Sequence, residues 1–345
     1  MFVYNAWYIA AWASEVERQP LHRTLLDEAI VLYRKRDGSA VALEDACPHR
    51  KLPLSMGTVN GDLIQCGYHG LEFDCTGQCV HIPGQQKIPR RAKVRSYPVV
   101  ERWGLLWLWM GEADTADASD IIEIPHYEDS SWGVNRGPAM PIDCDYRYMT
   151  DNLVDPSHVS YVHKSSLGNE ETVGIPVTTE EKGNAVIVSR WIENAVVAPF
   201  FQPYMKFFGK ADRLQHYEVR LPCSAVIKDV ISPAGSGAPQ GNIHPDSFLL
   251  DSYNFLTPVT ADSCRYYWFQ VRNFDPQDAA VSALLTEDFI TAFNEDVLIL
   301  EAVHRGIKNT RAELIHLQID AGSARLRRLL DEMVRQEQAA RKQQQ

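Results

Sequence analysis

Four residues near the start of the chain have side chains that bind metals and a spacing that restricts the choice of metal. The sequence CPHR supplies Cys47 and His49, and CGYHG supplies Cys66 and His69. Zinc also binds two cysteines with two histidines, but a zinc finger keeps its cysteines together and its histidines together. Here each segment contributes one of each kind. This interleaving favours a [2Fe-2S] cluster in which both cysteines bind one iron and both histidines bind the other.

The residues around these ligands suit two tight loops. Pro48, Gly67 and Gly70 allow turns whose backbone N–H groups point at sulfur, and the Tyr68 hydroxyl can donate from outside the ligand shell. Replacing two thiolates with neutral imidazoles raises the reduction potential of such a cluster. A cluster of this kind can accept an electron from a reductase and pass it to an oxygen-activating iron. The competing interpretation is two buried cysteines in loops that also carry unrelated histidines.

A second group of candidate ligands lies in the sequence DNLVDPSHVSYVH, residues 151–163. On a regular helix His158 and His163 point about 140° apart, with Asp155 between them. The two rings converge on one metal only if the helix is irregular, and Pro156 is a reason for irregularity. Two histidines and one carboxylate with open positions are a ligand set that non-haem Fe(II) uses. The alternative is that these histidines cap and pack an amphipathic helix.

The carboxylate ligand has two candidates. Asp155 is the nearer one. Asp296, in FITAFNEDVLILEAVHR, falls three residues after Phe293 and four before Leu300, so it projects into the apolar stripe of its helix. Its neighbour Glu295 is rotated by about 100° toward the flank of the helix. A buried carboxylate needs a partner, which can be a metal or a salt bridge, and the pattern alone leaves both open.

Composition restricts the partners and the compartment. The 345 residues carry a net charge of −11, so there is no basic surplus for binding nucleic-acid phosphates. No stretch approaches the roughly 18 apolar residues of a membrane span, and the N-terminus lacks the features of a secretion signal, which predicts a cytoplasmic protein. Seven cysteines, an odd number, make a poor disulfide framework. Two of them, Cys75 and Cys79, are predicted to be turn residues.

The length suits two domains. The first hundred residues contain short β segments separated by turn residues, which predicts a small β-rich domain, and a mixed region of strands and helices follows. The sequence GEADTADASDI, residues 111–121, has the composition of a linker or boundary loop. Helices are predicted over 146–163, 276–304 and 321–341, and residues 231–247, rich in Gly, Pro and Ser, are predicted to form a flexible loop.

The chain resembles the Rieske non-haem iron oxygenases, in the branch with the oxygenase components of vanillate O-demethylase, dicamba O-demethylase and toluenesulfonate methyl-monooxygenase. The likeness runs almost from end to end, through NAWYIAAW, CPHRKLPLSMG, CGYHGLEFDCTGQCVHIPGQ, PVVERWGLLWLWMG, CDYRYMTDNLVDPSHVSYVH and IDAG at 319–322. It implies an α+β fold with a Rieske [2Fe-2S] domain at 1–115. A mononuclear iron catalytic domain then follows at 116–345, with a central antiparallel sheet flanked by helices.

The resemblance also assigns roles. It makes His158, His163 and Asp296 the ligands of the mononuclear iron. It makes Asp155 a bridge within a homotrimer, which accepts a hydrogen bond from His69 of the next chain and holds His158. Asn152, one helical turn before Asp155, is predicted to line the site.

The substrate pocket is less well defined by the sequence. The resemblance places candidate pocket residues on central strands, where this chain has Ile227, Asn254 and Trp268, and in an aromatic loop with Phe200 and Phe201. For each of these positions an ordinary place in the core is an equal alternative.

The predicted function is that of the terminal oxygenase of a multicomponent monooxygenase, which uses O2 to attack a methoxy or methyl group of a small aromatic compound. Attack on an O-methyl carbon gives a hemiacetal that collapses to a phenol and formaldehyde. Because the chain has no dinucleotide-binding fingerprint, NAD(P)H would act indirectly, through a separate reductase or ferredoxin. The alternatives are aromatic-ring dihydroxylation, a Rieske protein that only transfers electrons, and a structural zinc protein.

Overall fold

In the computed structural model, which describes residues 2–164, 166–168 and 170–344, the chain forms two compact units. Unit 1 contains the residues up to Glu123 together with Thr257–Ala261, and unit 2 contains Ile124–Leu256 and the residues from Asp262 onward. The contacts therefore divide the chain after Glu123, whereas the predicted domains meet at 115/116, inside the linker predicted from composition at 111–121. As a boundary between functional domains, 115/116 stays a prediction.

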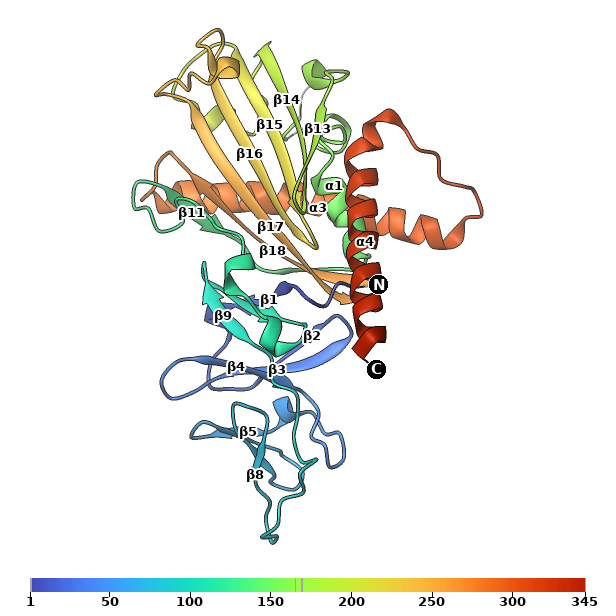
Figure 1. Cartoon of the computed structure of the whole chain (residues 1–345). Coiled ribbons are helices and arrows are strands. Elements are labelled where there is room, and N and C mark those ends of the chain that lie inside the picture. The colour runs from blue at the N-terminus through green and yellow to red at the C-terminus, as the bar shows by residue number, and fades with distance from the viewer. Residues whose placement is uncertain (1, 165, 169, 345) are drawn as a thin grey trace. The chain divides into compact units, whose positions relative to one another are not determined.

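Unit 1 consists of short antiparallel strands (Figure 1). Apolar runs such as WYIAAW and LLWLW are buried along their whole length, because their sheet is covered on both faces. The final residues of β17 contribute to this unit, since the carbonyls of Pro258 and Val259 accept the N–H groups of Leu26 and Asp27. The sheets are β1 (Trp7–Trp12), β10 (Leu105–Trp109) and β9 (Val99–Arg102); β2 (Leu21–Leu25), β3 (Glu28–Arg34) and β4 (Ala40–Glu44); and β5 (Thr58–Asn60), β6 (Leu63–Gln65), β7 (Glu72–Phe73) and β8 (Cys79–His81).

Unit 2 is built on a large sheet that has eight strands in the described part of the chain, in the order β11-β18-β17-β16-β15-β14-β13, with β12 also paired to β18. Neighbouring strands of this sheet, such as β15 and β16, pair in the antiparallel direction. Alternate residues of β15 are buried, as expected for a strand with one face on the core. The strands are β11 (Gly133–Arg136), β12 (Met140–Ile142), β13 (Thr178–Lys182), β14 (Ala185–Ala195), β15 (Ala211–Arg220), β16 (Ser224–Pro233), β17 (Phe248–Thr260) and β18 (Ser263–Arg272).

Helices flank this sheet, and the α+β fold is confirmed. α1 (Tyr146–Leu153) contacts β15 and β16, α3 (Ala279–Asn309) contacts β11, and α4 (Ala321–Gln344) contacts β13 and β14. α3 begins where the Asp278 carboxylate accepts N–H groups of the first turn, and it runs beyond the predicted end at 304. α4 likewise extends past 341.

Two predicted elements differ from the structure. The continuous helix over 146–163 is wrong: α1 ends at Leu153, and a separate short helix, α2 (Val159–Val162), follows. The flexible loop over 231–247 is shorter than predicted, because residues 231–233 complete β16, where Ile231 pairs with Phe248 of β17. The predicted linker at 111–121 does form irregular structure, with two short 3-10 turns. In the described part of the chain, no helix has both the length and the apolar character needed to cross a membrane.

Candidate metal centres

The candidate cluster ligands lie on two loops of unit 1, after β4 and after β6. Cys47 and Cys66 are both 2% exposed and belong to the apolar core of this unit. His49 and His69 are exposed, and their ring centroids lie 4.5 Å apart. Tyr68 packs against His69 with ring centroids 3.9 Å apart. The two loops therefore bring one buried sulfur and one surface imidazole each to the same region.

The backbones of the two loops follow the same pattern. Cys47 N–H donates to the Leu52 carbonyl at 2.9 Å, and Lys51 N–H donates back to the Cys47 carbonyl at 2.8 Å. In the second loop Cys66 N–H donates to the Leu71 carbonyl at 2.8 Å, and Gly70 N–H donates to Cys66 at 3.1 Å. Lys51 and Gly70 both have positive φ, the conformation that closes each turn. Two short sequence segments thus form ligand loops with the same backbone hydrogen-bond pattern.

The electrostatics around Cys47 fit a thiolate that binds a metal. Burial raises the pKa of the Cys47 thiol, and the nearby Cys66 thiol raises it further. The N–H groups of His49 and Arg50 act in the opposite direction, and the resulting pKa is about 11. The thiol therefore needs a metal to lose its proton, and the N–H groups are already directed at the sulfur.

The arrangement argues against a single zinc ion. Ligand atoms around one tetrahedral zinc lie within about 4 Å of one another, because each is about 2.0–2.3 Å from the metal. Among the described residues, the one group of three or more ligand atoms within 4.8 Å of each other lies elsewhere in the chain. The four Cys and His side chains therefore do not converge on one point, and a two-iron cluster fits them better. Of the two cysteines predicted to be turn residues, Cys75 is exposed in a turn, but the prediction for Cys79 is wrong, because Cys79 is buried in β8.

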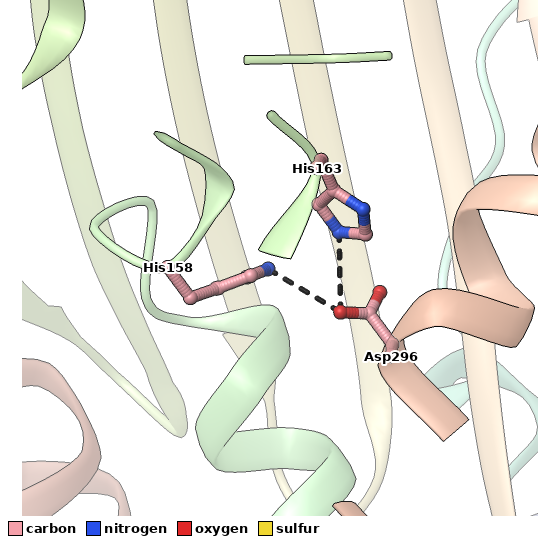
Figure 2. Close-up of side chains that lie close together, drawn as sticks. All are labelled: His158, His163 and Asp296. Atoms are coloured by element: carbon pink, nitrogen blue, oxygen red, sulfur yellow. Dashed lines mark ion pairs between the residues drawn. The ribbon is translucent and has the colours of Figure 1, made fainter. Parts of the chain in front are cut away.

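That other group is His158, His163 and Asp296, in unit 2. His158 Nε2 lies 3.5 Å from Asp296 Oδ1, and His163 Nε2 lies 3.1 Å from the same oxygen. Figure 2 shows the two imidazoles and the carboxylate pointing toward one another, the carboxylate from α3. Two imidazole nitrogens and a carboxylate form the facial set that suits non-haem Fe(II).

A break in the helix brings the two histidines together. α1 ends before Pro156, and the Asp155 carboxylate accepts the Ser157 N–H at 2.7 Å, which turns the chain. His158 immediately precedes α2 and His163 immediately follows it, and their ring centroids lie 5.3 Å apart. The irregularity predicted from Pro156 is present.

Side chains around the group hold it in place. Asn152 Nδ2 donates to Asp296 Oδ1 at 3.1 Å. Glu295 Oε2 lies 2.7 Å from His163 Nδ1, and it accepts the Ser166 hydroxyl at 3.2 Å. With Nε2 facing Asp296, the proton belongs on Nδ1, where Glu295 accepts it. Sequence reasoning assigned Glu295 to the flank of the helix and missed this contact. The signal available was the Glu-Asp pair itself, on a helix whose Asp was already a candidate ligand together with two histidines.

The two histidines differ in their electrostatics. Burial lowers the pKa of His158. Burial also acts to lower the pKa of His163, but the contacts with Asp296 and Glu295 outweigh it and the pKa is raised. His158 Nδ1 is buried and has no hydrogen-bond partner among the described residues, and the Asp155 carboxylate bonds to Ser157. The Nε2 of the same ring faces Asp296 and is the nitrogen that could bind a metal. A buried Nδ1 without a partner is unusual, and it marks His158 as a residue held for a function.

A cavity of about 50 Å³ adjoins the group. This volume holds one or two waters, so an aromatic ring enters only when wall side chains move. Its walls are mainly apolar and aromatic, with polar groups concentrated at a few positions. The lining includes Asn152, Leu153, Val159, Leu167, Arg213, Tyr217, Ile227, Asp229, Leu250, Ser252, Phe289 and Phe293, besides the three candidate ligands.

The candidate pocket residues occupy different places. Ile227 lines the cavity. Asn254 is fully buried and accepts the Tyr266 hydroxyl at 2.6 Å, and Trp268 packs edge-on against Phe293 behind the wall, so neither lines the cavity. Phe200 and Phe201 support the wall from outside, through Phe289 and Arg213 respectively.

Each of the two groups lies in a part of the chain that matches a known protein family. Residues 6–98 match the Rieske [2Fe-2S] domain, and residues 142–336 match the vanillate O-demethylase oxygenase C-terminal domain. The chain is 35% identical to the iron-sulfur subunit of the toluene-4-sulfonate monooxygenase system of Comamonas testosteroni, over 98% of both chains. It is 36% identical to a vanillate O-demethylase oxygenase subunit of a Pseudomonas species, over 99% of this chain and 97% of the relative.

The chain belongs to the Rieske non-haem iron oxygenases. A crystal structure of dicamba monooxygenase bound to 3,6-dichlorosalicylic acid has the same fold, with a TM-score of 0.90, 30% identity and coverage of 98% of this chain and 99% of that one. This Rieske oxygenase is accordingly an iron-dependent monooxygenase and the oxygenase component of a multicomponent system. Its cofactors are a Rieske [2Fe-2S] cluster and a mononuclear non-haem iron, and its electrons come indirectly from NAD(P)H through a reductase or ferredoxin.

Proposed function

We propose that this Rieske oxygenase oxidises a methoxy or methyl group on a small aromatic compound. The observation that carries the proposal is the position of the His158, His163 and Asp296 group at a cavity whose walls include Phe289 and Phe293. Aromatic walls bind an arene through its faces and edges. The substrates named for the relatives, vanillate, dicamba and toluene-4-sulfonate, are arenes with a methoxy or methyl substituent.

His158, His163 and Asp296 would hold the mononuclear iron, which when bound activates O2. Glu295 keeps His163 in the tautomer with a free Nε2, and Asn152 holds the Asp296 carboxylate. The apolar wall excludes water from the reacting carbon. Oxygen inserted into an O-methyl C–H bond gives a hemiacetal, which collapses to a phenol and formaldehyde; on an aryl methyl group the product is an alcohol.

Cys47, His49, Cys66 and His69 would hold the cluster. Because His49 and His69 are exposed, an iron that they held would lie near the surface, where an electron could enter and leave. The electron donor would be a flavin and iron-sulfur reductase.

A homotrimer would connect the two centres. By this proposal His69 of one chain donates to Asp155 of the next, in a closed head-to-tail ring. Two exposed apolar surfaces support it. Beside the cluster loops, Met56 is 68% and Tyr68 is 60% exposed. In unit 2, Tyr161 is 71% exposed and borders a cavity of about 470 Å³ that also includes Ser157, two residues from Asp155. Exposed apolar patches of this kind are typical of protein interfaces.

Formaldehyde release tests the reaction. The purified protein, reduced with a ferredoxin and its reductase, is supplied with a panel of methoxyarenes and methylarenes. Formaldehyde from methoxyarenes, or benzylic alcohols from methylarenes, are the expected products. Ring cis-diols in place of these products would instead assign the chain to ring dihydroxylation.

Mixing of inactive chains tests the trimer. His69→Ala lacks a working cluster and His158→Ala lacks a working mononuclear iron, so neither is expected to turn over alone. Co-assembled trimers place a sound cluster beside a sound iron across an interface, so partial activity is expected to return. Chains that co-purify by affinity tag yet regain no activity would exclude electron transfer between protomers.

A further inference from the structure

The cavity beside the candidate iron ligands contains an ion pair that has no part in holding the metal. Arg213 of β15 donates from both Nε and Nη2 to Oδ1 of Asp229 on β16, at 2.8 Å each, and from Nη1 to the Leu167 carbonyl at 2.9 Å. Its guanidinium lies 4.4 Å from the ring centroid of Phe201. Both charged residues are 7% exposed. The guanidinium is therefore fixed on several sides at the cavity wall.

Stability does not account for this pair. A buried ion pair loses so much hydration that hydrophobic replacements are often neutral or stabilising. Its neighbours on the wall include the apolar residues Ile227, Leu250 and Phe289. Apolar surroundings raise the free energy of both the guanidinium and the carboxylate. A charged side chain that is buried at a cost in free energy beside a ligand cavity is expected to bind the ligand.

The free edge of the guanidinium defines what it can bind. Arg213 is the single Lys or Arg among the residues that line this cavity. A guanidinium has five N–H groups, and the bonds of Arg213 to Asp229 and Leu167 use three of them. The planar fork matches two oxygens of a carboxylate or sulfonate, and charge-assisted bonds of this kind are about twice as strong as neutral ones.

We propose that Arg213 is the residue that selects the substrate of this oxygenase, by binding the anionic group of an aromatic carboxylate or sulfonate. The proposal rests on the proposed function and adds to it the side chain that orients the substrate. Asp229, Leu167 and Phe201 position the guanidinium, and the aromatic ring lies against Phe289 and Phe293. One molecule in the cavity then touches both the anchor and the candidate iron ligands, because all of them line the same space.

The negative charge of Asp229 does not prevent anion binding. Burial raises the pKa of this carboxyl, against the opposing effect of Arg213. When a second anion reaches Arg213, Asp229 can take up a proton, which leaves the net charge of the cavity unchanged. Protonated or not, its Oδ1 can keep its bonds to the guanidinium.

Binding to matched pairs tests the anchor without turnover. Dissociation constants are measured by calorimetry on the oxidised, metal-loaded protein for 4-methoxybenzoate against 4-methoxybenzamide, and for 4-methylbenzenesulfonate against its sulfonamide. At least one acid is expected to bind tenfold or more tightly than its amide, equivalent to about 1.4 kcal/mol. The preferred acid then identifies carboxylate or sulfonate. Amides that bind as tightly as both acids would overturn the proposal.

Variants locate the preference in Arg213. Arg213→Lys keeps the charge but loses the fork, and Arg213→Gln loses both, so the ratio of amide to acid dissociation constants should fall at least fivefold. The control is Arg190→Lys, on the neighbouring strand β14. Arg190 is also a buried arginine, bonded to Gln215 and to backbone carbonyls, and it does not line this cavity. A ratio that Arg213→Lys leaves at the wild-type value would overturn the proposal, and if these variants do not fold the wild-type pairs decide alone.

The same substrates separate this proposal from the proposed function. Acids that bind preferentially but yield neither formaldehyde nor a hydroxylated product would leave the anchor in place and remove the proposed reaction. Equal binding and equal turnover of acids and amides would leave the reaction in place and remove the anchor.

Discussion

The two candidate metal centres place their ligands differently with respect to solvent. At the cluster loops the cysteines are buried and the histidines are exposed, whereas His163 and Asp296 at the other centre are both buried and His158 is largely so. An electron must enter the cluster from another protein, so half of its ligand shell faces outward. Oxygen chemistry requires a site from which water is excluded, so its ligands face a small cavity.

Each centre is also supported by one carboxylate outside the ligand shell, in different ways. Asp45 accepts the N–H and the hydroxyl of Ser55 at 2.7 and 2.6 Å and contacts His22 Nδ1 at 2.7 Å, so it holds the backbone around the first cluster loop. Glu295 contacts a candidate ligand directly, at His163. We therefore expect that substitution of Glu295 changes metal binding in unit 2, whereas substitution of Asp45 changes the folding stability of unit 1.

The largest effect is expected for Asp296→Ala. Removing the shared carboxylate should reduce iron from about three to about two per chain, with the cluster absorption kept and turnover reduced by about a thousandfold or more. Iron analysis, the electron-paramagnetic spectrum of the reduced cluster and product formation are the measurements. Asp288→Ala is the control, because Asp288 lies on the same helix but accepts the Tyr204 hydroxyl at 3.1 Å. Loss of the cluster signal in Asp296→Ala would show that the two centres do not bind their metals independently.

Asp155→Asn is expected to stop electron delivery while both metals stay bound. The carboxylate turns the chain before α2 and is the proposed bridge, so turnover should fall by about a hundredfold with iron content near that of the wild type. Rapid-mixing absorption of the pre-reduced cluster should show slow oxidation in the presence of substrate and O2. Asp151→Asn, one turn earlier and paired with Arg327, is the control. Iron loss as large as in Asp296→Ala would mean that Asp155 is a ligand.

Glu295→Gln is expected to weaken iron binding by about 10- to 100-fold, because a neutral amide holds the His163 N–H less strongly. Chelator competition on the intact protein gives the affinity. Glu301→Gln is the matched control on α3, since Glu301 accepts the Asp143 N–H at 3.1 Å and touches no candidate ligand. Equal affinities for Glu295→Gln and the wild type would remove the role given to Glu295.

Asp45→Asn is expected to have the smallest effect on metals. The cluster spectrum should persist, while the free energy of unfolding falls by about 1–3 kcal/mol through the weakened bonds to Ser55 and His22. Denaturant titration followed by cluster absorbance measures it. A lost cluster at unchanged stability would show that Asp45 acts on the ligands and not on the fold.

Features that depend on a short stretch of sequence could be predicted, whereas features that depend on distant segments could not. The candidate cluster ligands were predicted from spacing alone, because each loop is a short segment with its own turn residues. Asp296 could be found from the apolar stripe of its helix, but its choice over Asp155 needed the family resemblance, since the pattern does not show which distant helix meets α1. Pro156 predicted irregularity but not the complete break between α1 and α2.

The substrate cavity is the part that the sequence predicted least. Asn254 and Trp268 lie behind the wall, and the pair of Arg213 with Asp229 was not foreseen. Which side chains of a sheet reach a cavity depends on strand register, and the register of β15 against β16 becomes known only in the folded structure. Glu295 was missed for a similar reason, because a helical projection gives the direction of a side chain but not its partner.

The adjacency of Glu295 and Asp296 on α3 limits how this helix can change. Their side chains leave the helix about 100° apart and contact opposite nitrogens of the same imidazole, that of His163. A single inserted residue earlier in α3 would turn both carboxylates away together, and no repacking of His163 alone could restore both contacts. Insertions and deletions in the first half of α3 are therefore expected to be tolerated only in whole turns, whereas the exposed segment after its end is free of this restriction.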